Sequence, residues 1–162
     1  MSKVGKEVKL GDLAGMQKEL LEEAEKVMET AYNPYSNFYV GAAILAQDGT
    51  IITGSNVENA AYGSTICAER AALLKANSMG KRMYESIAII ARGENFNTTE
   101  VTAPCGSCRQ MIYEASQISG KNIELILSTT KKDKIVVTSI EELLPLAFGP
   151  VDLGIDIKKY QK

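Results

Sequence analysis

Apolar side chains follow a helical period in the first part of the chain and strand-like patterns after it. From Asp12 onward they recur every three or four residues, with charged residues mostly between them, which predicts an amphipathic helix ending near Asn33-Pro34. Residues 38–45 and 51–57 have the composition of strands, and Asp48-Gly49 between them is typical of a β-hairpin turn. The pattern therefore predicts a helix followed by two antiparallel strands.

The rest of the chain alternates between helix and strand patterns. A helix is expected from about residue 66 to a stop before Gly80, and the apolar run at 87–91 is typical of a central strand covered on both faces. The order of elements predicts an α/β fold, namely an α/β/α sandwich with a five-stranded mixed sheet. The remaining expected elements are a helix from Pro104 to about Gln117, strands at 123–127 and 134–138, and a short helix that starts with a capping box at Ser139–Glu142.

All three cysteines of the chain lie in two short motifs. Cys67 belongs to the segment Ile-Cys-Ala-Glu-Arg, and Cys105 and Cys108 belong to Pro-Cys-Gly-Ser-Cys-Arg-Gln. Three thiolates can bind one zinc ion and leave its fourth tetrahedral position for water. Glu69, two residues after the first thiol, is the type of group that moves protons to and from such a water. The two motifs together predict a catalytic zinc site.

The spacing of the thiols fits the starts of two helices. Pro104 suits the first position of a helix, which would place Cys105 and Cys108 three residues apart on one side of its first turn. Thr65 is a candidate cap for a second helix with Cys67 in its first turn. Because helix N-termini carry partial positive charge, both helices would favour the thiolate form that a metal requires.

The charge of the cluster and the other chemistries of cysteine bear on the function of the same motifs. Three thiolates and Zn²⁺ carry a net negative charge, which Arg70 or Arg109 is placed to offset. A Cys-x-x-Cys pair alone also occurs in redox proteins and in structural zinc sites. A redox dithiol does not require Cys67 or Glu69, and a structural site usually has four ligands, whereas this sequence has three cysteines and no histidine. A catalytic site is favoured, with a non-catalytic zinc or redox protein as the alternative.

Composition limits the domain count and the class of partner. The 162 residues suffice for one domain, expected at 12–155 between a flexible leader at 1–11 and a tail at 156–162. The formal net charge of -2 argues against a nucleic-acid partner, because a phosphate backbone requires a basic surface. We expect no membrane span and no signal peptide, since no apolar run is long enough and residues 1–9 are polar. Metal-binding thiols fit a reducing compartment, so we expect a cytoplasmic protein. The net charge, which disfavours a nucleic-acid partner, favours action on a free small molecule.

The cysteine motifs match the signature of zinc deaminases, which is His or Cys, one residue, Glu, and a later Pro-Cys-x-x-Cys. Over roughly residues 12–155 the chain resembles small cytidine deaminases of the homotetrameric, three-cysteine type. The segments that carry the resemblance are 35–38, 40–43, 54–60, 62–63, 66–70, 104–110, 143–145 and 148–150. The resemblance implies hydrolysis of cytidine or 2′-deoxycytidine to uridine or 2′-deoxyuridine with release of ammonia. It also implies one Zn²⁺ per subunit and sites that a neighbouring subunit completes.

The resemblance further implies a role for each matching residue. Cys67, Cys105 and Cys108 would bind zinc, and Glu69 would be the proton shuttle. Phe38 would stack on the pyrimidine, and the Ala68 backbone would form a hydrogen bond with the base carbonyl. Asn56 and Glu58 would contact the ribose 3′-hydroxyl, and Arg70 and Gln110 would lie behind the thiolates. Ala60, Tyr62 and Phe148 would be donated across the subunit interface to the site of a neighbouring subunit.

Ordinary explanations remain open for several of these residues. A strand aromatic such as Phe38 is more often a core residue, and Asn56 and Glu58, as alternate strand residues, would alone indicate a solvated face. A related aminohydrolase, for instance a blasticidin S deaminase, would act on a modified cytosine nucleoside. The polar loop at 93–102 is longer than the resemblance leads us to expect, which makes it a candidate for altering access to the site or an interface.

Overall fold

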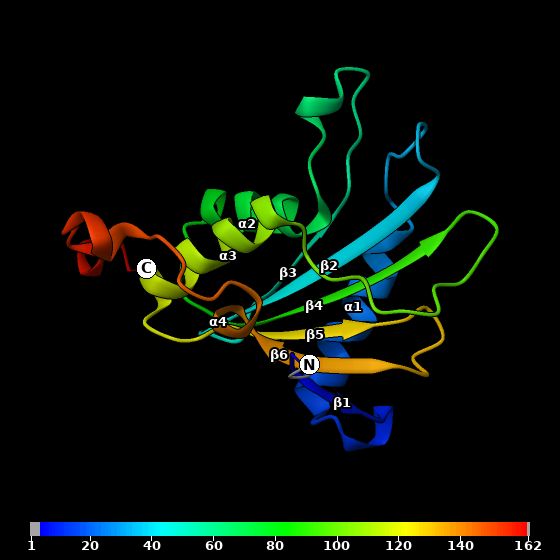
Figure 1. The fold of residues 1–162 in the computed structure, drawn as a ribbon, viewed down its shortest axis with the longest axis horizontal. Helices are drawn as coiled ribbons and strands as arrows, with labels where there is room; N and C mark the ends of the chain where they lie inside the picture. The colour runs from blue at the N-terminus through cyan, green and yellow to red at the C-terminus, as the bar shows by residue number, and fades with distance from the viewer. Residues whose placement is uncertain (1–3, 162) are drawn as a thin grey trace.

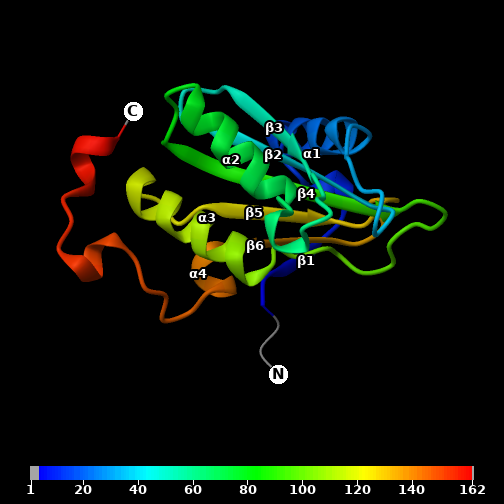
Figure 2. The same cartoon turned by 90° about the horizontal axis from the view of Figure 1, so that it is seen from above.

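Six strands form one mixed sheet in the computed structural model, which describes residues 4–161 (Figure 1). In chain order the strands are β1 Lys6–Val8, β2 Phe38–Ala46, β3 Ile51–Ser55, β4 Tyr84–Gly93, β5 Glu124–Ser128 and β6 Ile135–Ser139. Their order across the sheet is β1-β6-β5-β4-β2-β3, as the labels in Figure 2 show. Strands β4 and β5 are parallel, and the other neighbouring strands are antiparallel.

Helices cover both faces of this sheet. The α-helices are α1 Gly15–Met28, α2 Ala68–Ser78, α3 Gly106–Ser119 and α4 Ile140–Leu143. Within residues 4–161, four short 3₁₀ helices lie in the connections and the C-terminal segment, namely η1 Leu10–Asp12, η2 Tyr62–Ser64, η3 Pro150–Leu153 and η4 Ile157–Tyr160. Helices α2 and α3 lie side by side on one face and α1 lies on the other (Figures 1 and 2). The expected α/β/α arrangement is confirmed.

Side chains along the central strands point alternately to the two faces of the sheet, and they form one apolar cluster on each face. Ala42 and Ile44 of β2 pack in the cluster that contains α2 and α3, whereas Ala43 packs with Leu20 and Leu21 of α1. Successive strand side chains point to opposite faces, so the even-numbered residues of β2 face α2 and α3. This assignment decides on which side of the sheet the remaining site residues lie.

The described part of the chain forms a sheet of six strands, where the sequence predicts five. The additional strand is β1, in the segment expected to be a flexible leader, and it pairs antiparallel with β6 at the edge of the sheet. Its three residues, Lys-Glu-Val, carry too little pattern to be recognised as a strand without their partner. In the expected tail, η4 occupies residues 157–160. The parts of the leader at residues 1–3 and of the tail at Lys162 lie outside the described residues.

Most element boundaries agree with the sequence pattern, and two helix starts differ from it. The capping box at Ser139 is present, and Asp48-Gly49 connects β2 to β3 as expected. The expected starts at Thr65 and Pro104 are wrong by two residues or fewer, because Cys67 and Cys105 are the N-cap residues of α2 and α3. The helix predicted to reach Asn33 ends at Met28, and the strand predicted to reach Val57 ends at Ser55.

Candidate active site at the N-termini of α2 and α3

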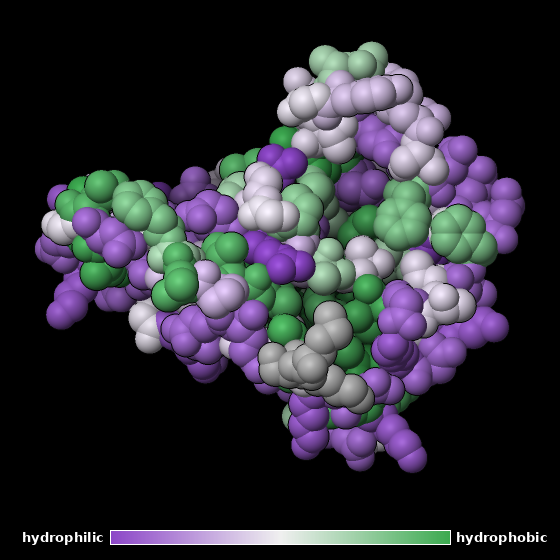
Figure 3. All heavy atoms as spheres, in the orientation of Figure 1, coloured by the Kyte–Doolittle hydropathy of each residue, from purple (hydrophilic) through white to green (hydrophobic). Residues whose placement is uncertain are grey.

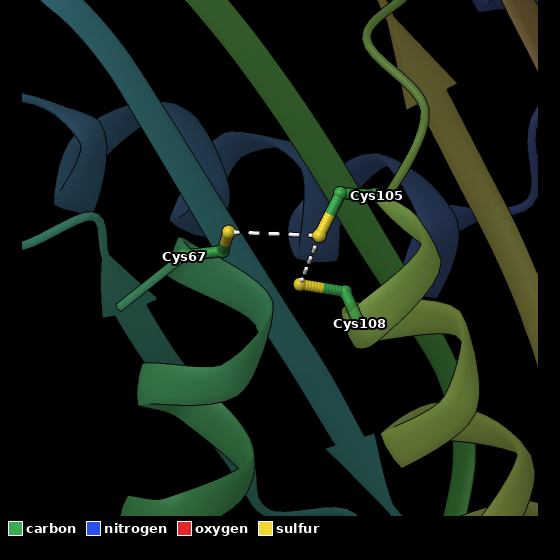
Figure 4. A group of neighbouring side chains, drawn as sticks. All are labelled: Cys67, Cys105 and Cys108. Atoms are coloured by element: carbon green, nitrogen blue, oxygen red, sulfur yellow. Dashed lines mark hydrogen bonds between the residues drawn. The ribbon is translucent and has the colours of Figure 1, made fainter. Parts of the chain in front are cut away.

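The three thiols converge from the starts of two neighbouring helices. Cys67 and Cys105 are both N-cap residues in an extended conformation, and Cys108 lies in the first turn of α3. Figure 4 shows the three sulfur atoms pointing toward one another across the gap between the helices. The first N–H groups of a helix have no intrahelical partner, and they carry the positive end of the helix dipole. Both helices therefore favour negative charge at the thiols.

The distances between the sulfur atoms fit one tetrahedral metal ion. Sγ of Cys67 lies 3.9 Å from Sγ of Cys105, which lies 3.5 Å from Sγ of Cys108, and all three atoms are within 4.8 Å of one another. Zinc–sulfur bonds of about 2.3 Å in tetrahedral geometry separate neighbouring sulfurs by roughly 3.8 Å. The donor set and its spacing therefore match zinc with three protein ligands.

The surroundings of the thiols shift the pKa values of two of the cysteines in opposite directions. A hydrogen bond with Cys108, followed by one from the Arg70 guanidinium, holds the pKa of Cys67 below its ordinary value despite partial burial. The same hydrogen bond with Cys67, together with burial, raises the pKa of Cys108. One thiolate is therefore already favoured before a metal displaces the other protons.

Glu69 follows the first thiol inside the first turn of α2, where only 4% of its surface is exposed. Burial is the main reason that the pKa of Glu69 rises to about 7, and the negative charge of the Cys67 thiolate adds to the effect. A carboxyl group with a pKa near neutrality can both accept and release a proton at physiological pH. The residue has the environment of a general acid–base group.

Arg70, rather than Arg109, is the cation beside the thiols. Nη2 of Arg70 lies 3.9 Å from Sγ of Cys67 and donates a 2.9 Å hydrogen bond to the Thr65 carbonyl. Its buried Nε has no hydrogen-bond partner among the described residues. Arg109 instead donates to the carbonyls of Pro104 and Leu143, at 2.8 and 2.9 Å. Of the two cations considered from the sequence, Arg70 is therefore the one placed to offset the thiolate charge.

Gln110 connects helix α3 to the C-terminal segment. Its Nε2 donates a 2.8 Å hydrogen bond to the carbonyl of Phe148, which joins α3 to the C-terminal segment. The role behind the thiolates that the resemblance implies for Gln110 stays a prediction. The hydrogen bond shows in addition that the exposed Gln110 side chain helps to position Phe148.

Phe38 lies on the same face of the sheet as the thiols. It is the first residue of β2 and is half-buried, and its even number places its side chain on the face that carries α2 and α3. Both helices begin near this end of the strands, so they leave Phe38 partly uncovered. The ring is therefore available to a ligand that enters from the side of the helix N-termini.

Asn56 and Glu58 lie just beyond β3 and both bind the backbone near the start of β2. Oδ1 of Asn56 accepts from Val40 N at 2.9 Å, and its Nδ2 donates to the Phe38 carbonyl at 2.9 Å. Glu58 accepts hydrogen bonds from Tyr35 N at 2.9 Å and from the backbone N–H and hydroxyl of Ser36. These bonds outweigh the opposing effect of burial and lower the pKa of Glu58.

Three candidate interface residues are exposed in the single chain. Ala60 and Tyr62 lie in the connection between β3 and α2, which projects from the molecule (Figure 1), and 74% of Tyr62 is exposed. Phe148 precedes η3 in the C-terminal segment and is 60% exposed. Tyr62 and Glu58 line one pocket of about 300 Å³, together with Tyr35, Ser36 and Thr65. Since Thr65 also accepts the Arg70 hydrogen bond, this pocket borders the loop that leads to Cys67.

Sequence reasoning missed two features of this region. Ser36 and Tyr35 hold Glu58, and Phe96 of the β4–α3 loop lies beside Phe38 with its ring centroid 6.4 Å away. The length of this loop makes it a candidate for altering access to the site, but a lone aromatic residue in a polar loop carries no sequence pattern that predicts its location. Its location depends on the pairing of β2 with β4.

An α/β/α fold that brings three thiols and a buried carboxyl group together at two helix N-termini defines a class of zinc-dependent hydrolytic enzymes. Residues 15–121 match the family described as the cytidine and deoxycytidylate deaminase zinc-binding region. The chain belongs to this family, and it is a zinc-dependent deaminase.

Named relatives and a solved structure agree with this assignment. The chain is 44% identical over 135 residues to cytidine deaminases from Sporosarcina psychrophila and Halalkalibacterium halodurans, covering 83% of this chain and 93% and 96% of theirs. The crystal structure of a cytidine deaminase from Burkholderia pseudomallei has a TM-score of 0.71 and 42% identity, covering 80% of this chain and 97% of that one. Within residues 4–161, no helix is both long and apolar enough to cross a bilayer.

Proposed function

We propose that the protein hydrolyses cytidine and 2′-deoxycytidine to uridine and 2′-deoxyuridine and releases ammonia. The observation that carries the proposal is the convergence of three thiols with Glu69, a buried carboxyl group whose pKa is raised to about 7. The 44% identity to named cytidine deaminases supports the substrate class. Neither a modified-nucleoside deaminase nor a non-catalytic zinc or redox protein is favoured by these relatives.

Cys67, Cys105 and Cys108 would hold one Zn²⁺ per subunit. When bound, the ion supplies Lewis-acid activation of a water molecule at neutral pH. Arg70 lies 3.9 Å from the first of these thiols and would offset part of the thiolate charge. Its positive charge and the two helix dipoles act in the same direction.

Glu69 would move the protons of the reaction. It accepts a proton from the attacking water and delivers it to ring N3, which makes C4 of the base more electrophilic. After the water oxygen has bonded to C4, Glu69 transfers the second proton to the amino nitrogen, and the C4–N bond breaks to release ammonia. A pKa near neutrality suits both transfers, because the group then changes protonation state at small cost.

Four residues would bind the nucleoside. Phe38 would stack on the pyrimidine, and the N–H of Ala68, at the first position of α2, would donate to the base carbonyl because helix geometry leaves it without an intrahelical partner. Asn56 and Glu58 would contact the ribose 3′-hydroxyl. Their hydrogen bonds to the backbone leave one amide hydrogen and further carboxylate lone pairs for a ligand.

We further infer a cytoplasmic homotetramer in which Ala60, Tyr62 and Phe148 complete the site of a neighbouring subunit. Their exposure in the single chain supports the inference, as does the exposed apolar surface of the C-terminal segment, which includes Leu146 and Leu153. A complementation experiment tests it: co-expressed Glu69→Gln and Phe148→Ala chains should form hybrid sites with more activity than either variant alone. A monomeric, fully active wild-type protein would contradict the shared site.

A substrate panel tests the proposed reaction. Ammonia release is measured for the zinc-replete protein with cytidine, 2′-deoxycytidine, deoxycytidylate and blasticidin S. Efficient turnover of both nucleosides is expected. Turnover of blasticidin S alone would identify the alternative deaminase, and no turnover of any compound by a zinc-loaded, folded protein would contradict the proposed function.

A further inference from the structure

Phe96 in the connection between β4 and α3 forms a pair with Phe38. The two ring centroids are 6.4 Å apart and the ring planes are inclined at 31°. Phe96 is 62% exposed, although it is a large apolar residue. Single exposed aromatics are common on protein surfaces and need no explanation by themselves. The placement of this ring, however, depends on several specific features of the chain.

The strand register places Phe96 on the thiol face of the sheet. Phe38 of β2 is directly opposite Gly93 of β4, so a side chain at Gly93 would lie on the same face as Phe38. Gly93 has no side chain, and a Cβ at this position would overlap the ring of Phe96. Phe96 therefore fills the space of the missing side chain, next to Phe38 and on the side of α2 and α3.

Hydrogen bonds hold this part of the loop. Gly93 N donates to the Phe96 carbonyl at 2.9 Å, and Glu94 N donates to the Asn37 carbonyl at 2.9 Å, beside the start of β2. Further along, the hydroxyl groups of Thr98 and Thr130 both donate to the Ala91 carbonyl, at 3.0 and 2.9 Å. These hydrogen bonds hold the backbone that carries the exposed ring. The ring therefore loses little conformational freedom when it contacts a ligand.

Figure 3 shows that this face is hollowed between the β3–α2 connection and the β4–α3 loop. We propose that Phe96 is a substrate-contacting residue that extends the aromatic wall begun by Phe38, and that this wall binds the planar base of a cytosine nucleoside. The inference rests on the proposed function, because it gives Phe96 a role beside the proposed stacking residue. Its expected contribution is to affinity, since Phe96 is not among the groups that transfer protons.

The first test compares Phe96→Ala and Phe96→Tyr with the wild-type holoenzyme in cytidine deamination. Loss of the ring should raise KM about five- to tenfold and change kcat by less than about twofold, as expected for one aromatic contact. Phe96→Tyr keeps the ring and should restore KM. Met16→Ala, which removes an exposed apolar side chain from α1 on the opposite face of the sheet, is the matched control and should behave as wild type.

A double-mutant cycle with Gly93→Ala tests whether the ring position is the cause. A Cβ at Gly93 displaces the ring, so Gly93→Ala should raise KM in the wild-type background and have little further effect in Phe96→Ala. Zinc content and melting temperature are measured for each variant. An unchanged KM in Phe96→Ala would overturn the inference, as would a joint loss of kcat, zinc and stability that Phe96→Tyr does not restore. Absence of cytidine turnover by the wild type would instead contradict the proposed function.

Discussion

At the scale of single residues, the site depends on the environment of one carboxyl group. Glu69 is buried beside the thiols, and this burial, more than the thiolate charge, raises its pKa to about 7. Arg70 counters the thiolate charge from 3.9 Å away. In the proposed mechanism the same local sequence, Cys-Ala-Glu-Arg, would therefore supply a metal ligand, a proton carrier and a compensating cation within one helical turn.

Replacing Glu69 by Gln keeps the size of the side chain and removes its ability to carry protons. We expect kcat for cytidine to fall by about a thousandfold or more, which is in the range of general acid–base catalysis, while zinc content stays at the wild-type level. Glu114→Gln on the exposed side of α3 is the matched control and should keep full activity. Turnover in Glu69→Gln close to that of the wild type would exclude the proton-transfer role.

The convergence of the site residues could be predicted from the sequence, and the neighbourhood of Phe38 could not. All three cysteines lie in two motifs, so a shared role was the simplest expectation. The location of Phe96 depends on the pairing of Phe38 with Gly93, which are far apart in the chain. The hydrogen bond that turns Gln110 toward Phe148 likewise joins segments that local patterns do not relate.

At the scale of elements, the local sequence pattern predicts the central strands and the long helices. It does not predict the edge strand of the sheet or the N-cap residues of two helices. Strand β1 is formed by pairing with β6, and its three residues contain no period that could identify it. The helix starts were misplaced because Cys67 and Cys105, which are not common capping residues, have the N-cap conformation. In each case a contact with another element or with the thiol cluster decides the outcome.

The contact between α1 and the sheet requires a glycine at position 41. A Cβ on Gly41 would overlap the Ala24 carbonyl oxygen and lie 2.9 Å from Cβ of Met28. Gly41→Ala should therefore lower the free energy of unfolding by about 2 kcal/mol, because helix and strand must separate. Gly15→Ala, at an open position in α1, should be neutral or slightly stabilising. Equal stability of the two variants in urea unfolding would contradict this packing.

An ion pair between Arg92 of β4 and Glu29 at the end of α1 should make a pH-dependent contribution to stability. The hydrogen bond from Arg92 holds the pKa of Glu29 below its ordinary value of 4.5. The stabilisation is thus present above pH 4.5 and disappears as the pH falls through the lowered pKa. A double-mutant cycle with Arg92→Gln and Glu29→Gln should give a coupling energy of only about 0.5 kcal/mol at pH 7, because Glu29 is largely exposed. At pH 2 the coupling energy should almost vanish, because Glu29 is then protonated. A coupling energy that is larger at pH 2 than at pH 7 would contradict this account.

At the scale of the whole molecule, the sheet separates a packing side from a reacting side. Helix α1 covers one face, whereas α2 and α3 cover the other and present their N-termini with the thiols. The exposed apolar residues of the C-terminal segment and the projecting β3–α2 connection lie outside this core. A single chain therefore brings together the three thiols and the buried carboxyl group of Glu69, and the proposed shared site would give the exposed rings of Tyr62 and Phe148 a role between subunits.

The most direct test of the account is the dependence of cytidine deamination on zinc. The purified protein is depleted of metal with a chelator, and ammonia release is measured before and after zinc is returned in steps. Depletion should lower turnover by about two orders of magnitude or more, and activity should return in proportion to zinc, with saturation near one ion per chain. Full activity in the metal-free protein, or saturation with zinc without any turnover of cytidine, would contradict the central claim.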